Sequence, residues 1–269
     1  RFINNNDPET DANGYHYLDH VVAIAAGGNV SLALRSNGQV YAWGSNNYGQ
    51  LGQGTAVWGN PASSQNDNQA RFVPMLVQTQ KDGKEVALEN VVDITAGHNH
   101  GVAMTVDHQV YAWGNAGGAL GTLAQVVTLA TDNPDVRPVK VEAGDSYTLT
   151  LMDDGSVYSW TTIANAATAL PVQNGQAPSR EGGTVYMAGM MTLSAGSGSN
   201  LVLSADGYLY AWGSNAYGEL GVGATGDVAS ADANSATRPT LVGGRAADLM
   251  QITTAEVTAA HSTAPGVSA

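Results

Sequence analysis

Short runs of alternating hydrophobic and polar residues recur along this chain in one fixed order. Each recurrence has an apolar or alternating run, a glycine, a second alternating stretch such as Ser31–Leu34, a turn, and a third run that ends in an aromatic residue. Alternation with period two is typical of half-buried β-strands. Four stretches carry the shared core of this pattern, namely Ala26–Gly44, Ala96–Gly114, Ala143–Thr161 and Ala195–Gly213.

The spacing inside the unit is constant, whereas the spacing between units varies. The opening glycines are Gly27, Gly97, Gly144 and Gly196, and the closing tryptophans are Trp43, Trp113, Trp160 and Trp212. In every unit the two lie 16 positions apart, but 54, 31 and 36 residues separate each tryptophan from the next opening glycine. A constant core with variable connections indicates an array of structural repeats.

Each unit is predicted to contain four short antiparallel strands. The first strands are predicted at Val21–Ala26, Val91–Ala96, Pro138–Ala143 and Met190–Ala195. The third strands are predicted at Gln39–Trp43, Val110–Trp113, Val157–Trp160 and Leu209–Trp212, and fourth apolar segments at Phe72–Val77, Gln125–Leu129 and Thr240–Val242. Four such strands per repeat form one blade of a β-propeller, so the expected fold class is all-β.

The turn before the third strand carries its own signal. Asn37-Gly38, Asp154-Gly155 and Asp206-Gly207 are dipeptides that favour two-residue type I′ hairpins. The second unit has Asp107-His108 instead. Because only glycine reaches positive φ freely, we expect His108 either to be strained or to change the turn type.

The third strand and the loop after it resemble the regulator-of-chromosome-condensation repeat. The motif is VYAWGSNNYGQLG at Val40–Gly52 and LYAWGSNAYGELG at Leu209–Gly221. It is shortened to WGNAGGALG at Trp113–Gly121 and lost after Trp160. This family commonly has histidine three residues after the opening glycine, and only His100 matches. The resemblance extends from Leu18 to Ala255 and implies a β-propeller, which in this family has seven blades.

The number of complete units is smaller than the resemblance implies. We expect a leader or closing strand at 1–20 and propeller repeats over 21–269, with blades at about 21–90, 91–135, 136–187 and 188–246 and a partial fifth at 247–269. The fifth unit begins at Leu249–Ala255, and the chain ends before its tryptophan. Three interpretations stay open: a fragment of a longer polypeptide, a smaller or open array, or blades supplied by another copy of the chain.

The charge of the chain argues against nucleic-acid partners. The formal net charge is −13, with only 10 Lys+Arg against 23 Asp+Glu. Nucleic-acid binding depends on lysine and arginine at the phosphates, and the sequence has no basic patch. We therefore expect no nucleic-acid partner, although the namesake of the family is bound to chromatin.

Composition bears weakly on the compartment. The chain has no cysteine, which excludes disulfides and thiolate chemistry. It has no apolar stretch near the ~18 residues that a membrane-spanning helix needs, so no membrane span is expected. Few lysines, many small polar residues and the acidity favour an extracellular or cell-surface protein of bacterial type.

Signals for catalysis or metal binding are sparse. There is no nucleophile elbow or phosphate-binding loop, so we expect a protein that is not an enzyme and has no cofactor. His98 and His100 flank Asn99 and could offer two imidazoles to a metal, but no carboxylate neighbour is evident. His16 and His20 would share a face only on a helix, which that segment does not resemble.

The segment Asp7–Gly14 has two interpretations. Its oxygen-bearing residues stand at alternate positions before a glycine, as they do in calcium loops, but the twelfth position counted from Glu9 is His20 and not glutamate. It could bind calcium, or it could be a solvated acidic leader. No metal residue is assigned.

The loops after the third strands are the candidate binding sites. Loops on a rigid β scaffold commonly carry function. The candidate partner-binding residues are Asn47, Tyr48, Gln50, Trp58, Tyr217 and Glu219. Trp58 lies in the long insertion Gln53–Arg71, where it is either an exposed anchor for a partner or a cover for its own loop.

These observations predict a non-enzymatic scaffold that binds protein partners or further copies of itself through loops and blade edges. Two alternatives stay open. The resemblance implies an exchange-factor-like regulator of a small GTP-binding protein, as for the family's namesake. Aromatic and amide side chains in the loops would also suit a glycan-binding module.

Overall fold

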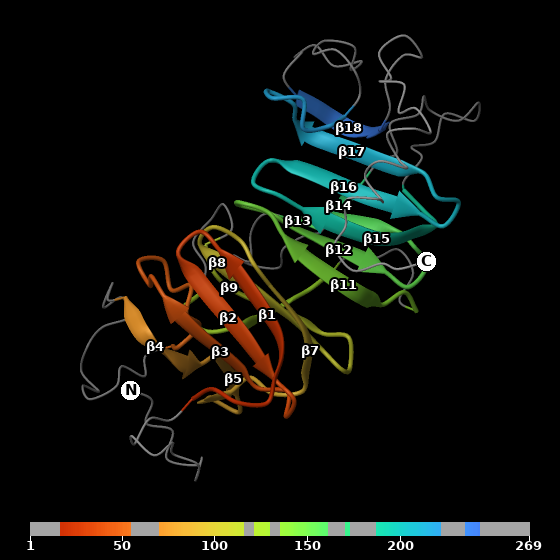
Figure 1. Ribbon diagram of the computed structural model, residues 1–269. Coiled ribbons are helices and arrows are strands. Elements are labelled where there is room, and N and C mark those ends of the chain that lie inside the picture. The colour runs from red at the N-terminus through yellow and green to blue at the C-terminus, as the bar shows by residue number, and fades with distance from the viewer. Residues whose placement is uncertain are drawn as a thin grey trace, which may run out of the picture.

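The structure is a computed structural model that describes residues 17–54, 70–115, 121–129, 135–160, 170–172, 187–221 and 235–242. These residues form four sheets of four strands and one two-stranded sheet, and they contain no helix. Accordingly, no helix in the described ranges could span a membrane. Figure 1 shows the four large sheets following one another in sequence order, with the first and the fourth at opposite ends. The predicted all-β propeller fold is confirmed.

Each large sheet is an antiparallel meander and makes one blade. Blade 1 consists of β1 (Val21–Gly27), β2 (Val30–Arg35), β3 (Val40–Gly44) and β4 (Arg71–Leu76). Blade 2 consists of β7 (Val91–Ala96), β8 (His100–Thr105), β9 (Val110–Gly114) and β10 (Gln125–Val127). Blade 3 consists of β11 (Pro138–Ala143), β12 (Thr148–Met152), β13 (Val157–Trp160) and β14 (Leu170–Pro171). Blade 4 consists of β15 (Met190–Ala195), β16 (Ser199–Ser204), β17 (Leu209–Ser214) and β18 (Ser235–Leu241).

A small hairpin between blades 1 and 2 was not predicted. It consists of β5 (Gln78–Lys81) and β6 (Lys84–Ala87), with positive φ at both Asp82 and Gly83. Two positive φ values define a type I′ turn, for which Asp-Gly is a preferred sequence. The Thr79 hydroxyl donates a hydrogen bond of 2.8 Å to the Ala124 carbonyl, which ties the hairpin to blade 2.

The turns between the second and third strands differ from the prediction of type I′. In blade 1, Gly38 has φ of 80°, but Asn37 is not among the described residues with positive φ. The Arg35 amide donates to the Gln39 carbonyl at 2.9 Å, and the Gly38 amide donates to the Arg35 carbonyl at 2.9 Å. This is a type I turn followed by a left-handed glycine, as in three-residue hairpin loops. The predicted turn type is therefore wrong, because the loop has one residue more than a type I′ turn allows.

His108 keeps this turn and takes the left-handed position itself, with φ of 63°. Of the two expected outcomes, the turn type is the same as in blade 1, and His108 takes a positive φ that is unfavourable for a residue with a Cβ. A compensating contact is present, because His108 Nδ1 donates to the Pro138 carbonyl at 2.8 Å. At the equivalent place in blade 3, the Met190 amide donates to the Gly155 carbonyl at 3.0 Å. Proline has no amide hydrogen, so Pro138 cannot make that bond, and the imidazole links blades 2 and 3 instead.

The hydrophobic core lies between successive blades. Three buried clusters each combine residues from two neighbouring blades, and they include Trp113, Trp160 and Trp212. These tryptophans of the repeat therefore serve packing between blades. The outer face of blade 1 is less covered, since Ile24 is 79% exposed whereas its equivalent in blade 2, Ile94, is 7% exposed. The expected fifth unit at Leu249–Ala255 lies outside the described residues.

Candidate functional site

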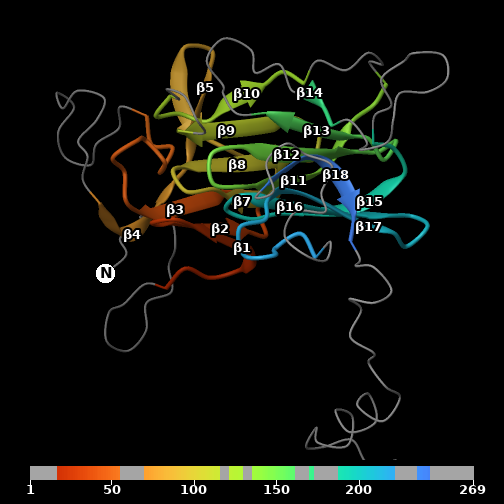
Figure 2. The same cartoon turned by 90° about the horizontal axis from the view of Figure 1, so that it is seen from above.

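The strands of each blade alternate in direction, so their connections fall at two ends. The loops between the third and fourth strands share one end with the turns between the first and second strands. We call this the loop end; it carries the loops Ser45–Gly52 and Ser214–Gly221. The opposite end carries the turns between the second and third strands, and we call it the hairpin end. Figure 2 shows the blades from a second direction.

The two loops have the same internal architecture. The Asn46 side-chain oxygen accepts a hydrogen bond from the Leu51 amide at 3.2 Å, and the Asn215 oxygen accepts from the Leu220 amide at 3.1 Å. Both leucines are fully buried. An asparagine that caps its own loop and a leucine anchored in the core leave the loop little freedom. Each loop is therefore a preformed surface element.

The residue two positions after each loop tyrosine completes this architecture. Gln50 Oε1 accepts from the Tyr48 amide at 2.8 Å, and Glu219 Oε2 accepts from the Tyr217 amide at 2.8 Å. Gln50 is 1% exposed, and its carbonyl accepts from Trp113 Nε1 at 2.9 Å. The side chain of Gln50 thus holds the loop from within, and its backbone carbonyl joins the loop to blade 2, while a contact of Gln50 with a partner stays a prediction.

Glu219 differs from Gln50 in being exposed. Hydrogen bonds from the backbone amides of Glu219 and Tyr217 hold the pKa of this carboxyl below its usual value. Its Oε1 also accepts from the Ser214 hydroxyl at 3.1 Å. The carboxylate therefore stays charged and oriented at the tip of the loop.

The remaining candidates fall into two separate places. On blade 1, Asn47 is exposed and Tyr48 is 50% exposed. On blade 4, Tyr217 is 94% exposed. Two blades lie between them, so the structure presents the same tyrosine-bearing element twice and not one converged site. Trp58 lies outside the described residues.

The candidate metal residues do not converge. His98 Nδ1 lies 3.2 Å from Asp145 Oδ1, while His100 is buried with Nε2 3.1 Å from the Thr148 hydroxyl. Among the described residues, no group of three or more His, Cys, Asp or Glu could hold a metal ion. His20 pairs with Asp19 at 3.1 Å. His16 and the segment Asp7–Gly14 lie outside the described residues.

The position three residues after the opening glycine has a role that sequence reasoning missed. In blade 2 it is His100, bonded to Thr148 of blade 3. In blade 3 it is Tyr147, whose hydroxyl donates to Asn200 Oδ1 of blade 4 at 2.6 Å. Burial lowers the pKa of His100 to about 4 and raises the pKa of Tyr147 to about 12. In blades 2 and 3 this position is a polar link to the next blade, and the signal available in the sequence was a polar residue one position later in the next unit, Thr148 or Asn200.

Sequence comparison identifies the repeat. A sequence model of the regulator of chromosome condensation (RCC1) repeat matches residues 37–104 and 206–264, and a second model of the same repeat matches 21–50 and 192–219. Together the matches cover more than half of the chain.

Relatives share the repeats but are longer proteins. The chain is 29% identical over 205 residues to the human E3 ubiquitin-protein ligase HERC2, covering 73% of this chain and 4% of that protein. It is 32% identical over 148 residues to the mouse regulator of chromosome condensation, covering 53% of this chain and 31% of that protein. The chain thus spans less than a third of the length of either relative.

Solved structures support the fold. The Saccharomyces cerevisiae protein Prp20p aligns with a TM-score of 0.58 at 20% identity, covering 83% of this chain and 53% of the yeast chain. Human WBSCR16 aligns with a TM-score of 0.55 at 17% identity, covering 85% of this chain and 54% of the human chain. At these identities the likeness shows the fold alone.

Proposed function

Because the chain is built from regulator of chromosome condensation repeats, we propose that it is a non-enzymatic propeller scaffold whose loop end binds a protein partner. Relatives of this fold support a binding role. Prp20p was described together with its binding properties to Gsp1p and histones, and yeast RCC1 (Prp20) was solved with Kap60 bound. Protein binding is thus a known use of the architecture.

The observation that carries the proposal is the duplicated rigid loop. Tyr48 and Tyr217 stand exposed on loops whose backbones are fixed by an asparagine cap and a buried leucine. Tyrosine is enriched at binding hot spots. A preformed loop loses little conformational entropy when a partner binds. Asn47 and Glu219 would add hydrogen-bonding groups beside these rings.

The proposal is tested by placing a photo-crosslinking amino acid at Tyr217 and, as a control, at Val126. Val126 is also exposed but lies in the middle of β10, the outermost strand of blade 2, and therefore at neither end of the blades. We expect discrete crosslinked products in an extract of the source cells from position 217 and not from position 126. The same products should weaken when Tyr48→Ser and Glu219→Gln are added. Equal crosslinking from both positions would contradict a partner surface at the loop end.

The exchange-factor interpretation has a specific observation in its favour, namely the 32% identity to the mouse regulator of chromosome condensation. A purified small GTP-binding protein loaded with a fluorescent guanine nucleotide provides the test. Accelerated nucleotide release on addition of this chain, lost in Tyr217→Ser, would favour it over a passive scaffold. An unchanged release rate would remove it and leave the scaffold proposal standing.

The compartment and the assembly state are further proposals. The low Lys+Arg count of 10, the many small polar residues and the net charge of −13 support an extracellular or surface location, which fractionation of the source cells would test. Self-assembly would appear in light scattering as a mass above 27.6 kDa that depends on concentration. A glycan array tests whether the loop tyrosines take sugars in place of protein.

A further inference from the structure

Each blade has a β-bulge at the same place in its first strand. The pairing register of the first and second strands shifts between Val21 and Ala23 in blade 1, and at the equivalent step in the other three blades. The extra residue of the bulge is Val22, Val92, Val139 or Met191. Bulges redirect side chains and recur beside functional surfaces.

All four bulge residues are large, apolar and exposed. Their exposed fractions are 63%, 51%, 41% and 62% in chain order. We call these four residues the apolar row. By contrast, the residue two positions later in blades 2 to 4, such as Ile94, is buried between blades. The bulge therefore takes one side chain per blade out of the interface between blades.

The members of the apolar row lie on neighbouring strands. The first strand of each blade packs against the first strand of the next, from β1 through β7 and β11 to β15. Each bulge also lies beside the turn between the second and third strands of its own blade, since Val91 pairs with Thr105 and Met190 with Ser204. The row thus follows the adjoining first strands at the hairpin end, opposite the loops of the proposed function.

The turns that flank the row are acidic in blades 2, 3 and 4. The exposed carboxylates there are Asp107, Asp153, Asp154 and Asp206. The residues just before β7 and β11 add exposed Glu89, Asp135 and Arg137, and Lys140 beside Val139 is paired with Glu142. The hairpin end of these blades is therefore an apolar row with a negatively charged rim.

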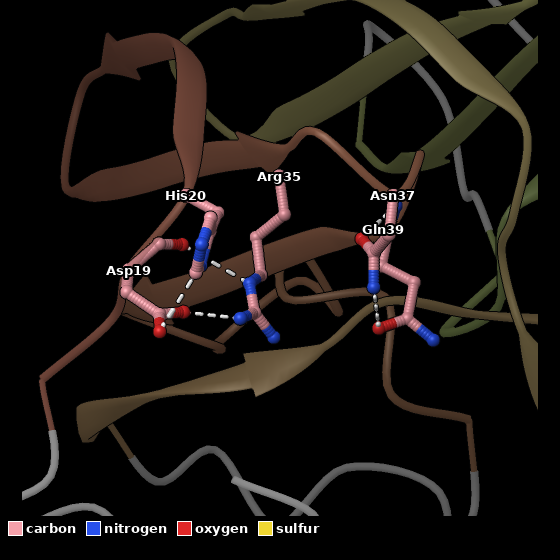
Figure 3. Close-up of polar contacts among 5 residues, drawn as sticks. All are labelled: Asp19, His20, Arg35, Asn37 and Gln39. Carbon is pink, nitrogen blue, oxygen red and sulfur yellow. Dashed lines mark hydrogen bonds and ion pairs between the residues drawn. The ribbon is translucent and has the colours of Figure 1, made fainter. Parts of the chain in front are cut away.

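Blade 1 is different, as Figure 3 shows. Arg35 donates two hydrogen bonds to Asp19. Its Nη2 donates to a carboxylate oxygen, and its Nε donates to the backbone carbonyl at 3.1 Å. Asn37 and Gln39 in the adjoining turn are uncharged and bond to each other at 3.0 Å. Because Arg35 balances the charge of Asp19, and Asn37 and Gln39 are neutral, the hairpin end of blade 1 lacks the excess negative charge of blades 2 to 4.

We propose that the apolar row and its acidic rim bind a cationic protein segment that carries apolar side chains between lysines or arginines. The apolar residues would cover the row, and the cations would meet the carboxylates of the turns in blades 2 to 4. A contiguous apolar patch with a polar rim is typical of interaction surfaces. A second copy of this chain fits poorly, because two chains of net charge −13 repel each other.

The test uses a labelled peptide of alternating lysine and leucine, with a serine–lysine and a leucine–glutamate peptide as comparisons. Fluorescence anisotropy should show saturable binding of the lysine–leucine peptide only, weakening as salt rises. Val92→Ser with Met191→Ser should lower its affinity at least tenfold. The matched control is Val126→Ser, because Val126 is 52% exposed but lies on β10 at the far side of its sheet.

The acidic rim is tested with Asp107→Asn and Asp206→Asn, controlled by Asp82→Asn in the turn between β5 and β6. In the rim variants the affinity for the lysine–leucine peptide should change less with salt concentration, whereas in the control variant its salt dependence should stay the same. Three results would overturn the proposal: no saturable binding, equal loss in Val126→Ser, or self-association of the unmodified chain that the row variants abolish. Binding that persists in Tyr48→Ser and Tyr217→Ser separates this surface from the loop end.

Discussion

Acidification should weaken the packing of blade 2 on blade 3 through His100. This side chain is fully buried, and its Nε2 lies 3.1 Å from the Thr148 hydroxyl of the next blade. Burial lowers its pKa to about 4 from an ordinary 6.5, although the nearby Asp145 acts in the opposite direction. As the pH falls, the imidazole of His100 therefore becomes protonated in the unfolded chain at a higher pH than in the native state.

The size and sign of the effect follow from the two pKa values. A group whose pKa is depressed in the native state stabilises the fold above its unfolded pKa and loses that contribution as pH falls. Here the loss begins below about pH 6.5, reaches about 2 kcal/mol at pH 5 and about 3 kcal/mol at pH 4. Against a typical total stability of about 5–15 kcal/mol this is a large fraction.

Urea unfolding from pH 7.5 to 4 measures the effect when the chain is compared with His100→Val. Valine is the residue that stands in the equivalent position of blade 1, as Val30. Burial also raises the pKa of Asp93, so this carboxyl adds a pH dependence of its own. Because both proteins share this group, the difference between their profiles isolates His100. Parallel profiles would refute the reasoning, whereas a gap that closes by about 3 kcal/mol on acidification is expected.

Three further predictions use urea unfolding at pH 7.5. Gly155→Ala should cost about 2–4 kcal/mol, because its Cβ would lie 2.6 Å from the Gly189 amide at a φ of 77°. Gly207→Ala changes the equivalent turn of blade 4, where φ is 83° and no atom lies within 4 Å of the added Cβ, so it should cost only about 1 kcal/mol. Equal losses of stability in Gly155→Ala and Gly207→Ala would contradict the close approach of blade 4 to blade 3. His108→Ala should cost about 1 kcal/mol, because it removes the hydrogen bond to blade 3. His108→Gly should be nearly neutral, because glycine adopts the left-handed backbone without strain and this gain offsets the lost bond. A larger loss of stability in His108→Gly than in His108→Ala would contradict a strained backbone at this position. Tyr147→Phe should cost about 1–2 kcal/mol by breaking the 2.6 Å bond to Asn200, and an unchanged midpoint would show that this bond adds nothing.

The strands were predictable because every unit repeats one alternating pattern. The predicted first strand Met190–Ala195 matches β15 residue for residue, and the fourth segment predicted at Phe72–Val77 lies one residue from β4, Arg71–Leu76. Four copies of the same pattern reinforce one another, so errors in a single copy matter little. The loop tyrosines were predictable for the same reason, since Tyr48 and Tyr217 occupy one position of the repeat.

Features set by contacts between blades were not predictable from the pattern. Gln50 looked like a loop-tip residue, yet the indole of Trp113, which lies 63 positions further on, bonds to its carbonyl. The type I′ prediction failed because the flanking residue also joins the turn, which dipeptide preference does not encode. The β5–β6 hairpin has an Asp-Gly turn signal at Asp82-Gly83, but it lies outside the repeat, so the repeat pattern does not predict it.

The links between blades explain why the repeats have diverged at just these positions. His100 faces Thr148 and Tyr147 faces Asn200, whereas the corresponding pair of the first interface is Val30 and Gly101. Gly101 admits no larger residue, since a Cβ there would lie 2.4 Å from the Trp113 ring. A histidine or tyrosine placed opposite that glycine would lose its buried partner, and an unpaired buried polar group costs about 1–3 kcal/mol. The first interface therefore disfavours a large polar residue in place of Val30, whereas each of the next two interfaces holds a hydrogen-bonded pair.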